Sequence, residues 1–231
     1  MSRPTLPAWH PARKRRRILF WRHGRTEWNS EGRFQGQEDI DLDATGRQQA
    51  ASAAALLANS NPTRIVSSDL RRAFGTAQAL ASVTGLEVEV DSRLRETFLG
   101  EWQGLTFADI VDRFPDQMDE WNAGSVEVRP GGGETRAEMA ERMAGGILEA
   151  VDGLDADGTL VVVTHGGAAR VGIAHLLGLP YEYWGVLSGL ANCNWSLLEE
   201  VEGSALEGKL RWRLTEHNAG TLPQPVTVQE G

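Results

Sequence analysis

Short apolar runs alternate along this chain with longer segments of helical periodicity. The clearest run, residues 159–164, is an uninterrupted stretch rich in β-branched residues, which is typical of a strand buried on both faces in a parallel sheet. A second run, residues 18–22, stops abruptly at His23-Gly24 and predicts a buried strand that leads into a loop. Further strands are predicted over residues 64–68 and 88–90 and, as outer strands at an antiparallel sheet edge, over residues 195–198 and 210–214.

Helical patterns fill most of the sequence between these strands. Asp43 or Thr45 can cap a helix that continues to residue 57, and Asp69 can cap a helix over residues 70–82. Further helices are predicted over residues 106–114, 134–151 and 166–177. Because strands alternate with helices, the pattern favours an α/β fold with a mostly parallel sheet.

The length of the chain, 231 residues, suits a single domain in which one or two layers of helix cover a sheet. We expect this domain to span residues 18–220, between a basic flexible tail of residues 1–17 and a flexible tail of residues 221–231. Residues 24–42 predict a long polar loop, and loops of this length are usually functional or disordered. Residues 97–133 are expected to form a cap-like insertion, irregular from residue 115 onward and without a core of its own.

The charge distribution excludes some classes of partner. The net charge is −9, but residues 1–17 carry six basic and no acidic residues, so the remainder carries 17 basic against 32 acidic residues, or −15. An acidic body argues against a nucleic-acid surface, and the basic segment is either an anion-binding arm or, as we expect, a solvated tail. With one cysteine, Cys193, no internal disulfide can form. No secretory signal or membrane-spanning run of about 18 apolar residues is found, so we expect a cytoplasmic protein.

Two histidines directly follow the carboxyl ends of predicted strands. His23 follows Arg22, and His165 follows residues 159–164. In an open α/β sheet, ligands bind beyond the carboxyl ends of the strands, so these side chains should border a ligand crevice. Arg72 lies in the first turn of a predicted helix, where a cation opposes the helix dipole unless an anion binds nearby. The pattern predicts a site with a fixed cation at Arg22 and a tunable base or nucleophile at His23.

Four segments carry the candidate chemistry in a particular order. They are Arg22-His23-Gly24 with Asn29, residues 67–73 with Thr76-Ala77, Leu94-Arg95-Glu96 with residues 99–104, and Thr164-His165-Gly166-Gly167. Together they resemble the histidine phosphatase superfamily, also called phosphoglycerate mutase-like, and they follow its order. The resemblance implies a three-layer α/β/α sandwich with a mostly parallel sheet and an antiparallel edge strand.

Departures from the family pattern point to its phosphatase branch. The stretch after Glu96 lacks the Tyr-Gly and Lys-rich pattern of the mutases, and the segment from Glu96 to His165 is short for a mutase. Arg25 stands where many members have an acidic or amide residue. Residues 93–106, with Trp195, residues 211–214 and Asn218-Ala219, resemble the glucosyl-3-phosphoglycerate phosphatases within the family.

The resemblance implies a phosphomonoesterase that hydrolyses a small sugar phosphate or phosphoglycerate through a phosphohistidine. His23 would be the nucleophile, and Glu96 would be the general acid and then the general base. Arg22 and Arg72 would hold the phosphoryl oxygens, and His165 would stabilise their charge. Since His23 must be neutral to attack while His165 does more when protonated, we expect their environments to move the two pKa values apart.

The implied substrate-binding set comprises Arg22, Asn29, Gln35, Gly36, Arg72 and His165. No cofactor or metal is expected, because His10, His175 and His217 show no ligand spacing. The expected partner is a small-molecule phosphomonoester, with no nucleic acid and no membrane, and a homodimer is left open. Two alternatives are also left open: a mutase-type phosphotransferase, and a non-catalytic module that binds a phosphate ligand.

Overall fold

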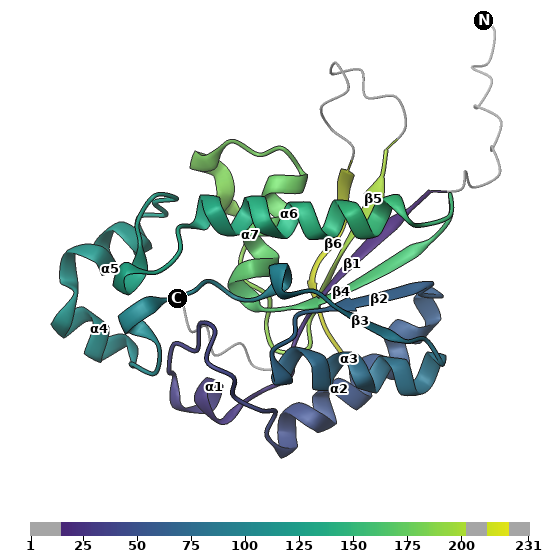
Figure 1. Cartoon of the computed structure of the whole chain (residues 1–231), viewed down its shortest axis with the longest axis horizontal. Coiled ribbons are helices and arrows are strands. Elements are labelled where there is room, and N and C mark those ends of the chain that lie inside the picture. The colour runs from purple at the N-terminus through teal and green to yellow at the C-terminus, as the bar shows by residue number, and fades with distance from the viewer. Residues whose placement is uncertain (1–14, 202–211, 222–231) are drawn as a thin grey trace, which may run out of the picture.

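The computed structural model describes residues 15–201 and 212–221 (Figure 1). Most of both predicted tails, residues 1–14 and 222–231, therefore lies outside the described residues, as do residues 210 and 211 of the last predicted strand. The described strands form one sheet in the order β3-β2-β4-β1-β5-β6. They are β1 (Arg17–Arg22), β2 (Arg64–Ser67), β3 (Val88–Val90), β4 (Thr159–Thr164), β5 (Trp195–Glu200) and β6 (Trp212–Ala219).

The sheet is mostly parallel, as predicted. Strands β3, β2, β4 and β1 pair in parallel, whereas β5 pairs antiparallel with both β1 and β6. The antiparallel part lies at one edge of the sheet, but the strand that reverses direction is β5, one position inside the edge strand β6. The buried strands β1 and β4 occupy the centre, as their continuous apolar sequences require.

Helices cover both faces of the sheet and complete the three-layer sandwich (Figure 1). Helices α2 (Ala44–Leu57) and α3 (Arg71–Thr84) lie on one face, and α6 (Arg136–Asp152) and α7 (Gly166–Leu176) lie on the other. Alternate β1 residues supply the two cores: Leu19 and Trp21 pack with α2 and α3, while Phe20 packs with α6 and α7. This alternation explains why β1 is apolar throughout.

The central strand pair places the two predicted histidines together. Arg22 of β1 is in register with Thr164 of β4, and the backbone N–H of His23 donates to the Thr164 carbonyl at 3.0 Å. His23 and His165 therefore directly follow the carboxyl ends of two adjacent parallel strands, although they are far apart in the sequence.

Two sequence predictions for the loops need correction. The predicted loop 24–42 contains a short helix, α1 (Glu27–Glu31), which Thr26 and Asn29 start with a capping box. Helix α3 is not capped by Asp69: its N-cap is Leu70, which makes no side-chain cap bond, and the Asp69 carboxylate instead pairs with the Arg95 guanidinium. A nearby cation thus outcompetes the helix terminus for Asp69.

The cap-like insertion is more ordered than predicted. The expected short helix is α4 (Phe107–Arg113), but a further helix, α5 (Pro115–Asn122), follows it where an irregular segment was predicted. The prediction was wrong because Pro115 occupies the first turn of α5, where a proline is tolerated, and does not end the helical region. The insertion also has a small core of its own, which comprises Leu99, Trp102, Ile110, Met118, Trp121 and Val128.

Short 3₁₀ helices connect several of these elements. They cover Ala58–Ser60, Ser92–Leu94, Gly100–Trp102, Pro130–Gly132 and Tyr181–Val186. Within the part of the chain that the structure describes, none of the helices combines the length and apolar character needed to span a membrane.

Candidate active site

A cavity of about 680 Å³ opens at the carboxyl ends of the central strands, beside the cap. Seven of the eight predicted site residues line it, namely Arg22, His23, Asn29, Gln35, Gly36, Arg72 and Glu96. The eighth, His165, is fully buried directly behind them, with its ring centroid 5.1 Å from that of His23. The fold thus gathers residues from four separate stretches of sequence into one site.

His23 presents an unprotonated ring nitrogen to the cavity. Its Nδ1 lies 2.7 Å from the carbonyl oxygen of Gly24, and because a carbonyl can only accept, Nδ1 must carry the proton. Nε2 of the neutral ring therefore keeps its lone pair. Burial, together with the charges of Arg72 and Arg22, holds the pKa of His23 well below its usual value, so the ring is neutral at pH 7.

Arg22 and Arg72 supply positive charge to the lining of the cavity. Arg72 donates from its two terminal nitrogens to the carbonyls of Glu38 and Gly36, at 2.6 and 2.7 Å. Arg22 donates to the Leu190 carbonyl at 2.6 Å, and its buried Nε has no hydrogen-bond partner. Burial lowers the pKa of both groups, that of Arg72 to about 10, so both remain charged at pH 7. Neither forms an ion pair with a described carboxylate, which leaves their charge available to an anion.

His165 contacts the site through Arg72. Its Nδ1 accepts from Arg72 Nε at 3.2 Å, so the proton lies on Nε2, which is 3.0 Å from the Ser68 hydroxyl. Burial and the charge of Arg72 also hold the pKa of His165 well below its usual value. The expectation that the two histidine pKa values move apart is therefore wrong, because the same two causes act on both rings.

Glu96 is held at the start of α7. Its carboxylate accepts hydrogen bonds from the backbone N–H groups of Thr97, Gly167 and Ala168, at 3.0, 3.1 and 2.9 Å. The positive end of a helix dipole favours a negative charge at this position. Helix α7 begins directly after His165, so the second histidine and the carboxylate are placed by the same strand-to-helix junction.

Asn29 and Gln35 offer amide donors to the cavity. The Asn29 side-chain oxygen accepts from the Thr26 backbone N–H at 3.1 Å, and the Gln35 oxygen accepts from the Thr26 hydroxyl at 3.0 Å. Their oxygens are thus used within the protein, and neither amide nitrogen donates to another described residue. Gly36 has a left-handed φ of 51°, a conformation that favours glycine.

Comparison with known proteins identifies the family. The sequence profile of the histidine phosphatase superfamily (branch 1) matches residues 18–211. This chain belongs to that superfamily. A glucosyl-3-phosphoglycerate phosphatase from Mycobacterium tuberculosis is 43% identical over 213 residues, which cover 88% of this chain and 95% of the relative.

Solved structures agree with the sequence relatives. A mycobacterial glucosyl-3-phosphoglycerate phosphatase in complex with VO3 is 42% identical, has a TM-score of 0.81, and is matched over 90% of this chain and 100% of its own. A phosphoserine phosphatase from Entamoeba histolytica in complex with phosphoserine is 27% identical, with a TM-score of 0.76 and coverages of 88% and 97%. The family resemblance inferred from the sequence is therefore confirmed, as is the fold.

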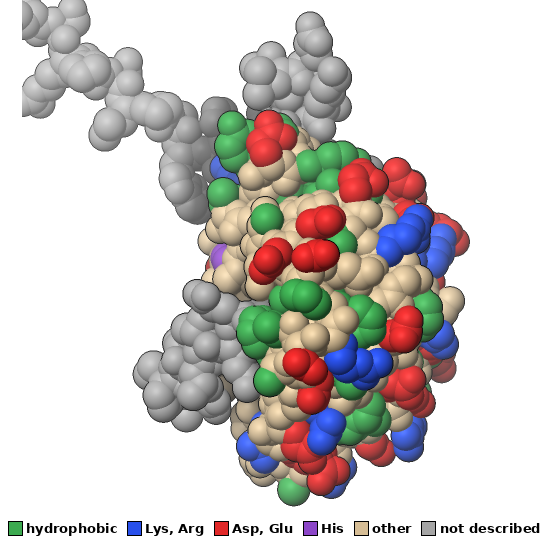
Figure 2. Space-filling model, turned by 90° about the vertical axis from the view of Figure 1, so that its left-hand side faces the viewer, with side chains coloured by type: hydrophobic (Ala, Val, Ile, Leu, Met, Phe, Trp, Pro, Cys, Tyr) green, Lys and Arg blue, Asp and Glu red, His purple; other side chains and the backbone are tan. Residues whose placement is uncertain are grey.

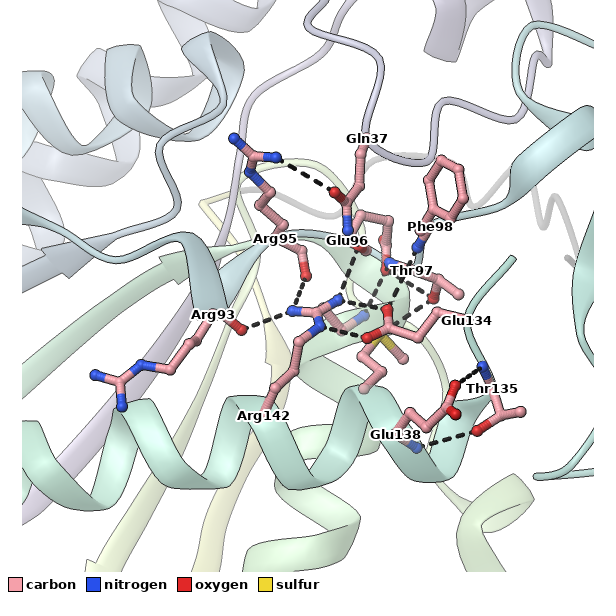
Figure 3. A network of polar contacts seen from close by, with 12 residues as sticks. Gln37, Arg93, Arg95, Glu96, Thr97, Phe98, Glu134, Thr135, Glu138 and Arg142 are labelled. Carbon is pink, nitrogen blue, oxygen red and sulfur yellow. Dashed lines mark hydrogen bonds and ion pairs between the residues drawn. The ribbon is translucent and has the colours of Figure 1, made fainter. Parts of the chain in front are cut away.

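One residue of this histidine phosphatase that sequence reasoning missed is Arg142, on α6. Its guanidinium reaches across to the segment before the cap and donates to the backbone carbonyls of Arg93, Arg95 and Glu96 at 2.6 to 2.9 Å (Figure 3). Glu134 holds it in place through two bonds of 2.6 and 2.7 Å. Arg142 therefore fixes the main chain that carries Glu96, and no side-chain spacing in the sequence signals a contact with carbonyls.

Two further arginines missed by sequence reasoning, Arg136 and Arg170, line the same cavity. The Arg136 guanidinium stacks on Trp121, with its Cζ 3.6 Å from the ring centroid. Burial and the charge of Arg170 lower the pKa of Arg136 to about 9. Arg170 lies on α7, one turn after Gly167, and this spacing from the His165-Gly166-Gly167 segment could have identified it.

The described residues contain no cluster of three or more His, Cys, Asp or Glu side chains that could hold a metal ion. Cys193 is buried, and burial raises the pKa of its thiol to about 12. The thiol is therefore protonated at neutral pH and is a poor nucleophile.

Proposed function

We propose that this protein is a phosphomonoesterase that forms a phosphohistidine on His23, and that its substrate is glucosyl-3-phosphoglycerate or a close analogue. The observation that carries the proposal is the unprotonated Nε2 of His23 in one cavity with the buried Arg72 and the half-buried Arg22. The identity of 43% to a glucosyl-3-phosphoglycerate phosphatase, over nearly the whole of that relative, supports the substrate.

Binding of the phosphoryl group falls to the arginines and amides. A phosphomonoester carries nearly two negative charges at pH 7, and guanidinium groups donate to its oxygens in pairs. Arg22 and Arg72 supply these donors, and the free amide nitrogens of Asn29 and Gln35 complete the set. His165 holds Arg72 in place through Nδ1, and its contact with the phosphoryl oxygens stays a prediction.

The reaction proceeds in two steps. First, Nε2 of His23 attacks phosphorus, the bond between phosphorus and the alcohol oxygen breaks, and protonated Glu96 gives its proton to that oxygen. Second, Glu96 removes a proton from a water molecule whose oxygen attacks phosphorus, and the phosphorus–nitrogen bond breaks. Inorganic phosphate is released, and His23 and Glu96 return to their starting states. Positioned acid–base help of this kind contributes about 10²–10⁴-fold in rate.

The nucleophile is tested by trapping the intermediate. The enzyme is mixed with ³²P-labelled 3-phosphoglycerate and quenched, and acid-labile, base-stable phosphate on the protein is counted. We expect the label on the wild type and on the control His217→Ala, whose histidine is not among the cavity-lining residues. We expect none on His23→Ala. Turnover that survives His23→Ala would contradict the mechanism.

Assays of the reaction products separate the alternatives. A mutase-type phosphotransferase would interconvert 2- and 3-phosphoglycerate and would need a bisphosphate, without net release of inorganic phosphate. A non-catalytic binding module would release no phosphate from p-nitrophenyl phosphate at any pH. Release of inorganic phosphate without isomerisation supports the phosphatase.

We also propose that the enzyme works on a free metabolite in the cytoplasm. The acidic balance of the chain outside its first 17 residues, −15, and the mixture of acidic and basic side chains on the face shown in Figure 2 disfavour a nucleic-acid partner. A single buried cysteine is compatible with a reducing compartment. A homodimer stays a prediction that sedimentation would test.

A further inference from the structure

The lining of the active-site cavity includes a second pair of arginines besides Arg22 and Arg72. Arg136 and Arg170 line the same cavity, and the charge that acts on Arg136 is that of Arg170. Glu96 lines the same cavity and attracts Arg170 as well as Arg22 and Arg72. A ligand that contacts His23 and Glu96 can therefore extend toward a second pair of guanidinium groups.

These two arginines lack a counter-ion within the described residues. Arg170 makes no hydrogen bond or ion pair there, although burial lowers its pKa. Arg136 is 4% exposed, donates only to the carbonyls of Ser125 and Trp121, and has a buried Nε without a partner. Glu96 makes no hydrogen bond with Arg170 among the described residues, and its carboxylate instead accepts from three backbone N–H groups.

A buried cation, Arg136, and a half-buried one, Arg170, that repel each other cost stability unless an anion joins them. Arg136 is fixed by the Trp121 ring and by the Ser125 carbonyl, so it supplies a stationary positive charge. Arg170 has no such contacts, and its five N–H donors are free to form a two-point contact with a carboxylate. The positive charge of Arg136 and Arg170 and the free donors of Arg170 therefore favour an anionic ligand group beside them.

We propose that Arg170, assisted by the positive charge of Arg136 in the same cavity, binds a carboxylate carried by the leaving alcohol. The preferred substrates are then phosphomonoesters with a second anionic group, as in a phosphoglycerate whose carboxylate stands two carbons from the phosphorylated carbon. This inference rests on the proposed phosphatase function, which fixes the phosphoryl group at His23. Glu96, which lines the same cavity, would protonate the oxygen that joins the phosphoryl group to this alcohol.

Two substrates that differ only at the proposed contact provide the test. In 3-phosphoglycerate the group at this position is a carboxylate, and in glycerol 3-phosphate it is a neutral hydroxymethyl. The ratio of kcat/KM values for the two compounds is measured in the wild type, Arg170→Gln and Arg170→Lys. We expect Arg170→Gln to lower the ratio by about 10- to 100-fold, the effect of losing hydrogen bonds to a charged group, with little change for glycerol 3-phosphate. Arg170→Lys should retain part of this ratio, because lysine supplies the positive charge without the paired N–H donors of a guanidinium group.

A matched control is Arg213→Gln, which removes an exposed arginine of β6 that does not line the cavity and should leave the ratio unchanged. Equal losses on both substrates would overturn the inference and assign Arg170 to the support of Glu96. An unchanged ratio in Arg170→Gln would overturn it as well.

Binding without turnover separates this inference from the proposed function. Calorimetric titration of His23→Ala with each compound should show tighter binding of 3-phosphoglycerate, and adding Arg170→Gln should remove the difference. If the wild type hydrolyses no phosphomonoester, the proposed function fails, yet the titration still tests the carboxylate site. Equal affinities in His23→Ala would overturn the carboxylate site while leaving the hydrolysis of p-nitrophenyl phosphate untouched.

Discussion

At the scale of single residues, the site is defined by neutral histidines next to permanent cations. His23 and His165 are both buried, and the nearby charge of Arg72 adds to burial in disfavouring their protonated forms. In the mechanism we propose, neutral His23 attacks phosphorus, and a low pKa favours that form. The same property affects folding, because the unfolded chain has no reason to keep these rings neutral.

The stability of the protein should fall as the pH drops below about 6.5, the usual histidine pKa. Below that pH the unfolded chain binds protons at both positions, whereas the folded protein does not, so the free energy of unfolding decreases. Each histidine contributes a slope of about 1.4 kcal/mol per pH unit in this window, and above it the stability is fully present. Urea unfolding of the phosphate-free protein between about pH 7.5 and pH 5.5 measures the slope.

The control for this prediction is His165→Gln. Its free energy of unfolding should change less steeply with pH, because its unfolded chain binds one proton fewer. The pKa of the half-buried His217 is also lowered by burial and adds a background that both proteins share. The interpretation is wrong if His165→Gln and the wild type lose stability in parallel over this pH range.

At the scale of elements, the sequence predicted the strands and helices whose formation depends on the pattern of neighbouring residues. The strands that carry His23 and His165 were recognised because each is an apolar run that ends in a polar residue and glycine. Contacts between side chains and the backbone were not recognised. Arg142 donates to three carbonyls of a distant segment, and because every residue has a carbonyl, the sequence does not indicate which ones are bound. Helix α5 was missed because Pro115 starts a helix as readily as it follows one.

Arg142→Met should slow catalysis more than it weakens substrate binding. The variant leaves three carbonyls before the cap without their donor, so Glu96 loses its fixed position while Arg22 and Arg72 stay in place. We expect kcat for p-nitrophenyl phosphate to fall by at least about tenfold, within the range of acid–base effects, with KM changed much less. Arg142→Lys should recover part of kcat.

A purely structural role for Arg142 would lower thermal stability without this split between kcat and KM. The comparison variant is Arg113→Met, which removes an exposed arginine that contacts the Phe114 ring in the cap. Arg113→Met should leave both constants unchanged. A loss in KM alone for Arg142→Met would contradict the positioning of Glu96.

At the scale of the whole molecule, the buried hydrophobic residues form three separate clusters. One cluster packs on each face of the sheet, and the third lies inside the cap. Two members of the cap cluster, Leu99 and Trp121, also line the cavity, and Trp121 supports Arg136. In the function we propose, residues at the sheet carry the phosphoryl chemistry, while the packing of the cap sets the shape of the space for the rest of the substrate.

Because the cap has its own core, alanine substitutions of two buried isoleucines should have different effects on activity. Ile110→Ala opens the cap core and Ile147→Ala opens the core between α6 and the sheet, and neither side chain lines the cavity. Both should lower the free energy of unfolding by about 2–5 kcal/mol. Only Ile110→Ala should lower kcat/KM for 3-phosphoglycerate relative to p-nitrophenyl phosphate, because a loosened cap displaces Arg136, and misplacement of about 1 Å can cost 10²-fold. Urea unfolding and the kcat/KM ratio are measured on both variants, and equal changes in the ratio would show that the cap does not act as a separate unit.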